Sequence, residues 1–447
     1  MKRKSIAPLL LMGMFSFTQI RLGGSIGISE LIASLICPVI FVLNFQNIRR
    51  DGFLPLMSLA ALCILGCFIA GWVNNTDFLR LSKGLAATYA FFSGIVVFHF
   101  LLRERLDGVK WVLVGFAISV VINAFYFHYG AEGVRSVTEG ATGADAAVNM
   151  AKNNTLFWSS RLEHWLLLPI RGWYLSTPLV YTILAPLGLV IFSIFVTASG
   201  RSLALVSVVS VFLSIVCGKS ARKMQRISKG FWWYLIIALA IALAFKSIYM
   251  NLGKHGKLSE AQMRKYESQT RGGTKTGALQ FLMSGRVEFF VGMTAALRRP
   301  ILGYGPWPID EDGIYFEFLE KYGDVEDFEL FDKVRQVQRG SGRYMWLPSH
   351  SIIVEFWQWF GIFGLILWLY IIWHIYLYFR RYLTCVPQWF GFLALYTPTA
   401  IWHIFFSPFG GRLFWSFFVV MLFLNRAIAV GRLRLPPDME FEKWNHR

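Results

Sequence analysis

Residues 350–379 read HSIIVEFWQWFGIFGLILWLYIIWHIYLYF, and apart from two histidines Glu355 is the only acidic or basic residue in this run. A helix needs about 17–25 predominantly apolar residues to cross a bilayer, and this run is long enough. Directly before it, residues 251–349 are rich in acidic and polar side chains and could not lie in lipid. The contrast predicts a membrane protein with one large extramembrane insert.

The composition of the whole chain agrees with this prediction. Of the 447 residues, 55% are hydrophobic and 16% are charged, whereas about a quarter of the residues of a soluble domain are charged. The formal net charge is +18, and the lysines and arginines stand in short loops beside apolar runs. That distribution is typical of the positive-inside rule. We therefore expect an all-α polytopic membrane protein that contacts membrane lipids and does not bind nucleic acid.

Eleven apolar runs qualify as membrane spans: 5–20, 25–44, 53–73, 80–102, 109–129, 177–197, 201–217, 231–250, 350–379, 388–406 and 411–428. The positively charged loops are 46–51, 103–110, 219–230, 380–387 and the tail from Arg426. These loops lie on one side of the membrane only if one more crossing exists between 130 and 176. The best candidate is 154–171, although it contains Arg161, Glu163 and His164, which would have to face protein or water.

The predicted layout thus has twelve spans, with both termini inside. Residues 1–250 form a transmembrane bundle of nine spans with an outer loop at 130–153. Residues 251–349 form a large outer loop between spans nine and ten, and residues 350–447 hold the last three spans and an inner tail. Within the large loop, 286–299 is amphipathic, because Phe289, Met293 and Leu297 share one helix face. We expect Pro300 to end that helix.

Three cationic residues stand at predicted helix starts on the outer side: Arg201 after Gly200, Arg286 after Gly285, and His350 after Ser349. A cation is electrostatically misplaced there, because a helix N-terminus is already partly positive. A bound anion would compensate, and arginine offers a bidentate fork that matches phosphate oxygens. Gly200 and Gly285 would let a phosphate approach the backbone closely.

A plainer reading is that water and lipid headgroups hold each of these residues at the interface. Gly411 and Arg412 have the same arrangement at the start of the last span, so the pattern is not confined to the three. His350 differs from the arginines because imidazole titrates near neutrality. A helix N-terminus and nearby arginines favour its neutral form, which could accept a proton as a general base. Alternatively, His350 caps its own helix.

The same stretches resemble the O-antigen ligase and polymerase family of bacterial envelope glycosyltransferases. Ser284-Gly285-Arg286, followed by Pro300, Gly303 and Gly305, is similar to the family's S-G-R helix and P-x-x-G-x-G turn. His350-Ser351, followed by Gly361 and Gly364, stands where the family usually has His-Asn and then G-x-x-G. Residues 197–201, TASGR, resemble the family's T-x-S-R-G with Gly200 and Arg201 in exchanged order.

The resemblance implies a GT-C-like membrane fold in the bacterial inner membrane, with the active site facing the periplasm. It implies an undecaprenyl-diphosphate-linked glycan as donor, lipid A–core or another glycan as acceptor, and no metal or other cofactor. Arg286 and Arg201 would bind the diphosphate and His350 would activate the acceptor. Gly200, Gly285, Gly303 and Gly305 would supply supporting backbone. Ligation and repeat-unit polymerisation share this donor chemistry, so the residues leave both open.

Two readings from other classes compete with the transferase. Twelve spans and a basic outer mouth would also suit a transporter of a lipid-linked oligosaccharide, although transporters more often place charged sites near the midplane between repeats. A metal-dependent enzyme could use the acidic run Asp310-Glu311-Asp312 to hold a divalent cation against a diphosphate. The same run could equally be a solvated acidic loop.

Overall fold

The computed structural model describes residues 6–16, 19–21, 25–116, 118–119, 247–248, 250–257, 263, 266, 287–310, 312–315, 317, 347, 351–382, 386, 389–407, 409 and 412–435. The N-terminal half starts with α1 (Ala7–Met14) and a short antiparallel ribbon of β1 (Gln19–Arg21) and β2 (Ser25–Gly27). Then come α2 (Ile28–Arg50), α3 (Leu54–Val73), α4 (Phe78–Arg103) and the 3₁₀ helix η1 (Leu106–Gly108).

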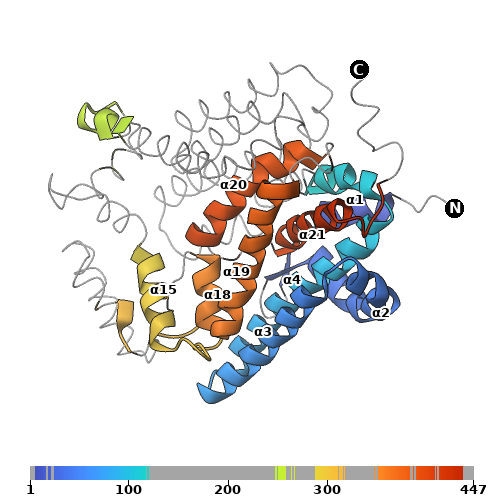
Figure 1. The fold of residues 1–447 in the computed structure, drawn as a ribbon. Coiled ribbons are helices and arrows are strands. Elements are labelled where there is room, and N and C mark those ends of the chain that lie inside the picture. The colour runs from blue at the N-terminus through green and yellow to red at the C-terminus, as the bar shows by residue number, and fades with distance from the viewer. Residues whose placement is uncertain are drawn as a thin grey trace.

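The C-terminal half contains α15 (Val287–Arg298), α18 (Ile352–Phe360), α19 (Ile362–Leu377), the π-helix η4 (Tyr378–Tyr382), α20 (Phe390–Phe406) and α21 (Arg412–Ala429). The described chain is therefore mostly helical (Figure 1). α15 confirms the helix predicted within residues 286–299. Phe289 and Met293 pack against the core, whereas Leu297 is exposed.

Four of these helices, α2, α3, α4 and α21, are long and apolar enough to cross a membrane. Their 18 to 26 residues correspond to about 27–39 Å at 1.5 Å per residue, against a hydrocarbon core of about 30 Å. They coincide with the predicted spans 25–44, 53–73, 80–102 and 411–428. The chain thus has the helices of a membrane protein, as its composition predicts.

The core of the bundle forms where α4 packs along both α2 and α21. Gly94 permits the close approach of α21, because a Cβ added there would lie only 2.5 Å from Ser416 Oγ. The same hydroxyl donates to the carbonyl oxygen of Phe91 at 2.6 Å. Buried aromatic side chains, Phe98 and Phe417 among them, fill the space between the helices in edge-to-face pairs.

The predicted first span, 5–20, is wrong as a single helix. α1 has eight residues, about 12 Å, which is less than half the thickness of the hydrocarbon core. The chain then enters the ribbon at Gln19, where Ile20 pairs with Ile26. Phe15 ends the helix, and the hydroxyl of Ser16 turns back to the carbonyl oxygen of Met12 at 2.6 Å. Hydropathy alone missed this break, because Phe15, Phe17 and Ile20 keep the run apolar on average.

The prediction of one continuous helix over 350–379 is also wrong. α18 ends at Phe360, and the chain reverses at Gly361, which has φ +59° and ψ −144°. Phe356 and Trp368 have ring centroids 5.4 Å apart, although twelve residues of a straight helix would separate them by about 18 Å. α18 therefore folds back on α19 as a helical hairpin. α19 has 16 residues and is one of the shorter apolar helices, and η4 continues it at its C-terminal end.

The loops of the described helices gather at two ends. At one end the α3–α4 loop meets the segment after α15, where Asn74 Nδ2 donates to the carbonyl oxygen of Gly303 at 3.1 Å. At the other end the α2–α3 turn meets the end of α4, where Arg103 Nε donates to Asp51 Oδ2 at 2.6 Å. The predicted spans between 130 and 246, including 154–171, and the outer loop 130–153 lie outside the described residues.

Candidate functional site

The predicted site residues Arg201, Arg286, His350, Gly200 and Gly285 lie outside the described residues. The helices that directly follow two of them are described. α15 begins at Val287, the residue after Arg286, and Ser351, the residue after His350, is the N-cap of α18. The arrangement of α15 and α18 therefore bears on the predicted site.

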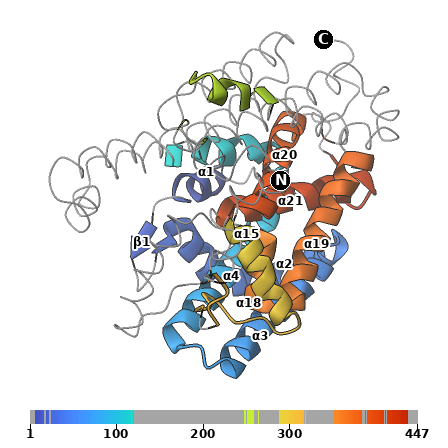
Figure 2. The same ribbon diagram turned by 90° about the vertical axis from the view of Figure 1, so that its left-hand side faces the viewer.

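α15 and α18 lie side by side in both views (Figure 1 and Figure 2) and pack against each other. Near the C-terminal end of α18, two side chains donate to α15 and to the turn that follows it. Trp357 Nε1 donates to the carbonyl oxygen of Pro300 at 3.0 Å. The buried Gln358 donates through Nε2 to the carbonyl oxygen of Gly292 at 3.2 Å. These bonds fix the two helices relative to each other.

The N-terminal ends of both helices reach one place, the last turn of α20. The ring of Phe289 in α15 lies 5.9 Å from the ring of Phe406. The hydroxyl of Ser351, which is fully buried, donates to the carbonyl oxygen of Ile404 at 3.0 Å. α15 and α18 thus both begin at the C-terminal turn of α20 and both end at the glycine turn after Pro300.

The first turn of α18 is held by two side chains. Ser351 Oγ accepts the backbone N–H of Val354 at 3.4 Å, as a helix N-cap does. Glu355 lies in the same first turn. Its Oε2 accepts the backbone N–H of Phe409 at 2.9 Å and so ties α18 to the loop between α20 and α21.

The predicted motif glycines Gly303 and Gly305 lie in the turn after α15, with φ +74° and +84°. In this conformation glycine is strongly favoured, because it has no Cβ. A Cβ on Gly303 would come within 2.5 Å of the carbonyl oxygen of Gln358, and one on Gly305 within 3.0 Å of Thr76 Oγ1. Tyr304 N donates to that Gln358 oxygen at 2.6 Å. The turn therefore docks on the end of α18 and on the α3–α4 loop.

Gly361, in the predicted G-x-x-G motif, lies on the other side of the contact between the turn after Pro300 and the end of α18. Ile362 N, at the start of α19, donates to the carbonyl oxygen of Ile301 at 3.0 Å. The predicted P-x-x-G-x-G and G-x-x-G stretches, far apart in sequence, thus meet backbone to backbone. Arg299 closes the turn from outside, with its guanidinium 4.4 Å from the ring centroid of Tyr304 and a hydrogen bond to Asn74 Oδ1.

Arg412 tests the electrostatic argument within the described residues. It is the first residue of α21, as predicted, and its Nε donates to Glu30 Oε1 at 3.2 Å. The other carboxylate oxygen of Glu30 accepts the backbone N–H of Gly27 at 3.0 Å. An anion does compensate this cation at a helix start, but here the anion is a carboxylate of the protein.

Asp310, which the metal hypothesis used, has a structural role. Its two carboxylate oxygens accept the backbone N–H groups of Ile314 at 2.8 Å and Tyr315 at 2.9 Å. Burial raises the pKa of Asp310, and these two hydrogen bonds oppose the shift. Both oxygens are thus engaged in folding the segment onto α15. The described residues contain no cluster of three or more histidine, cysteine or acidic side chains placed to hold a metal.

His403 is a residue at this place that the sequence reasoning missed. It lies in the last turn of α20, is partly exposed, and its Nδ1 is 2.7 Å from Ser407 Oγ. The spacing of four residues between His403 and Ser407 could have indicated the pair, because it places both on one helix face.

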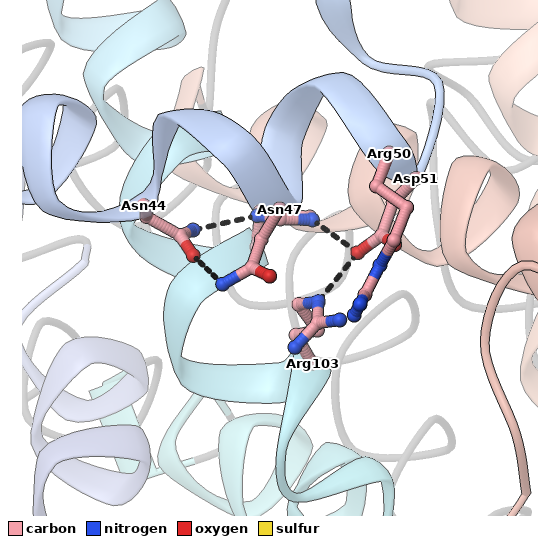
Figure 3. Close-up of polar contacts among 6 residues, drawn as sticks. Asn44, Asn47, Arg50, Asp51 and Arg103 are labelled. Atoms are coloured by element: carbon pink, nitrogen blue, oxygen red, sulfur yellow. Dashed lines mark hydrogen bonds and ion pairs between the residues drawn. The ribbon is translucent and has the colours of Figure 1, made fainter.

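A second polar cluster lies at the other end of the bundle, between α2 and α4 (Figure 3). Asn47 Nδ2 donates to Asn44 Oδ1 at 2.8 Å, and Asn44 Nδ2 lies 2.9 Å from His99 Nδ1. His99 Nε2 lies 3.0 Å from Asp51 Oδ2, which also accepts from Arg103. Asn44, His99 and Asp51 are almost fully buried. The cluster joins two helices and is remote from the last turn of α20. We therefore assign it a structural role, which is to hold α2 and α4 together.

Comparisons of the chain with family models, with curated proteins and with solved structures returned no match. Function therefore has to be inferred from the residues and from the junction of α15, α18 and α20.

Proposed function

We propose that the chain is a membrane glycosyltransferase that moves a glycan from an undecaprenyl-diphosphate carrier to an acceptor hydroxyl. The observation that carries the proposal is the common starting place of α15 and α18 at the end of α20. Arg286 directly precedes one helix and His350 precedes the N-cap of the other. Two helix N-termini at one place favour a bound anion.

In the proposed reaction the acceptor hydroxyl oxygen attacks the anomeric carbon of the donor sugar. His350 takes the hydroxyl proton, and the bond between the anomeric carbon and the diphosphate oxygen breaks. Arg286 and Arg201 stabilise the charge that develops on the leaving diphosphate. A single displacement of this kind inverts the anomeric centre. The resemblance of the motifs to O-antigen ligases and polymerases supports the same assignment.

Turnover and binding of a purified lipid-linked donor, measured in detergent, test the proposal. Arg286→Ala should lose donor binding and turnover, and Arg286→Lys should stay impaired because the bidentate fork is lost. His350→Ala should keep binding but lose roughly 10²–10⁴-fold in turnover. His350→Gln should also stay nearly inactive. The exposed Arg298, which pairs with Glu317 at 2.7 Å, provides a matched control whose alanine variant should behave like wild type.

Unchanged turnover in Arg286→Ala or His350→Gln would remove that residue from the site. A wild-type protein that binds the donor without consuming it would point to the transporter instead. Deletion of the gene in cells identifies the acceptor. Polymer left on the carrier, with none on lipid A–core, identifies a ligase, whereas surface glycan of single repeats identifies a polymerase. The ligase is our proposal, with location in the bacterial inner membrane and the site on its periplasmic face.

A further inference from the structure

One face of α3 carries an exposed apolar stripe along much of its length. The stripe is formed by side chains three or four residues apart, which are between 38% and 76% exposed: Leu62, Leu65, Phe68 and Trp72. α3 is long and apolar enough to cross a membrane, and its 20 residues correspond to about 30 Å, the thickness of the hydrocarbon core. In a bilayer this stripe would face the lipid chains. Trp72, at its end, would lie at the boundary with the headgroups, where tryptophan is enriched.

Arg299 is held beside this end of α3. Asn74, which directly follows α3, donates through Nδ2 to the carbonyl oxygens of Ala70 at 2.8 Å and Gly303 at 3.1 Å. Both hydrogens of the amide are thus used, and its Oδ1 accepts from the guanidinium of Arg299. The ring of Tyr304 contacts the same guanidinium, at 4.4 Å from the ring centroid. The guanidinium is therefore fixed at the level where α3 would leave the hydrocarbon core.

The partners of Arg299 leave its positive charge uncompensated. Asn74 and Tyr304 are neutral, and within the described part of the chain no acidic side chain forms an ion pair with Arg299. The neighbouring Arg298, in contrast, pairs with Glu317 at 2.7 Å. Arg299 is exposed, so its remaining N–H groups can reach a phosphate, whose oxygens match the guanidinium fork.

We propose that this end of α3 binds an anionic phospholipid, with the lipid phosphate on Arg299 and an acyl chain along the exposed stripe. The stripe ends at Trp72 and the cation follows directly beyond it, which is the order of acyl chain and phosphate in a phospholipid. Ile301, which is 69% exposed, adds apolar surface beside Arg299. Asn74 is a positioning residue, because it orients the guanidinium. The inference does not depend on the proposed function, since it concerns a lipid held by α3 and the turn after α15.

The test measures stepwise binding of dioleoylphosphatidylglycerol to the full-length protein in detergent by native mass spectrometry. Arg299→Ala should weaken the first binding step by about tenfold or more, as expected for lost hydrogen bonds to a charged group. Arg299→Lys should weaken it less, because lysine keeps the charge but lacks the fork. The matched control Arg298→Ala should leave this step unchanged. Trp72→Ala should also weaken the step, whereas Trp373→Ala, which removes a 52% exposed tryptophan from α19, should not.

Unchanged binding in Arg299→Ala or Trp72→Ala would overturn the inference, and so would an equal loss in Arg298→Ala. A loss that Arg299→Lys shares in full, and that follows a lower melting temperature, would overturn it too, because Arg299 would then only support the turn after α15. Competition identifies the source of the phosphate. Neither a large excess of inorganic phosphate nor an equimolar amount of undecaprenyl diphosphate should displace the phospholipid. Displacement by the first would indicate a site for free phosphate, displacement by the second would assign the site to the carrier, and either result would refute the phospholipid.

Discussion

Replacing Gly361 by alanine should undo the docking of the α18–α19 hairpin on the turn after α15. Gly361 has φ +59°, a conformation that residues with a Cβ rarely adopt. An added Cβ would also collide with the carbonyl group of Ile301. That carbonyl accepts Ile362 N at 3.0 Å, so the backbone could move aside only by giving up the bond.

The loss of stability in Gly361→Ala follows from the backbone strain and the collision with Ile301. Holding a residue other than glycine in this conformation costs about 1–3 kcal/mol. Displacing the backbone would also weaken the hydrogen bonds from Ile362 N to Ile301 and from Tyr304 N to Gln358. Each contributes about 0.5–1.5 kcal/mol net. We therefore expect Gly361→Ala to destabilise the protein by about 2–6 kcal/mol.

Gly431 provides the matched control. Its φ is +73°, but no described atom lies within 4 Å of a Cβ added there. Gly431→Ala should therefore show only the strain of about 1–3 kcal/mol. The assay is thermal unfolding of both variants in the same detergent, together with donor turnover. Equal melting temperatures for the two variants would refute the docking of Gly361 on Ile301 as a source of stability.

Three further predictions concern other parts of the chain. Because burial raises the pKa of Asp310, its contribution to stability is present at low pH and is lost as the pH rises through that pKa. The melting temperature of wild type relative to Asp310→Asn should therefore fall as the pH rises above about 4, the ordinary pKa of an aspartate, and a constant difference would contradict this. A cysteine at Gly313 should react with an impermeant thiol reagent applied to whole cells from which the outer membrane has been removed. A cysteine at Lys223 should not react. Reversed labelling would invert the predicted topology. His99→Leu should lower stability by about 1–3 kcal/mol by unpairing the buried polar groups beside it, whereas the exposed His255→Leu should change the melting temperature little.

The sequence alone was sufficient for the class of protein and for most of the described long helices. A helix satisfies its own backbone hydrogen bonds, so an uninterrupted apolar run in lipid has little alternative to forming one. For this reason α2, α3, α4 and α21 coincide with predicted spans. The helix α15 was also predictable, because an amphipathic period of 3.6 and a following proline are local signals.

The tertiary structure decided what local signals could not. Gly361 lies within an apolar run that reads as one helix, and the reversal there exists because the turn after Pro300 occupies the space in which a Cβ would lie. Likewise, the first turns of α15 and α18 both meet the end of α20, although the three segments are far apart in the sequence. Hydropathy measures how favourable the transfer of each residue into lipid is. It carries no information about which helix ends meet, since contacts between segments far apart in the chain determine that.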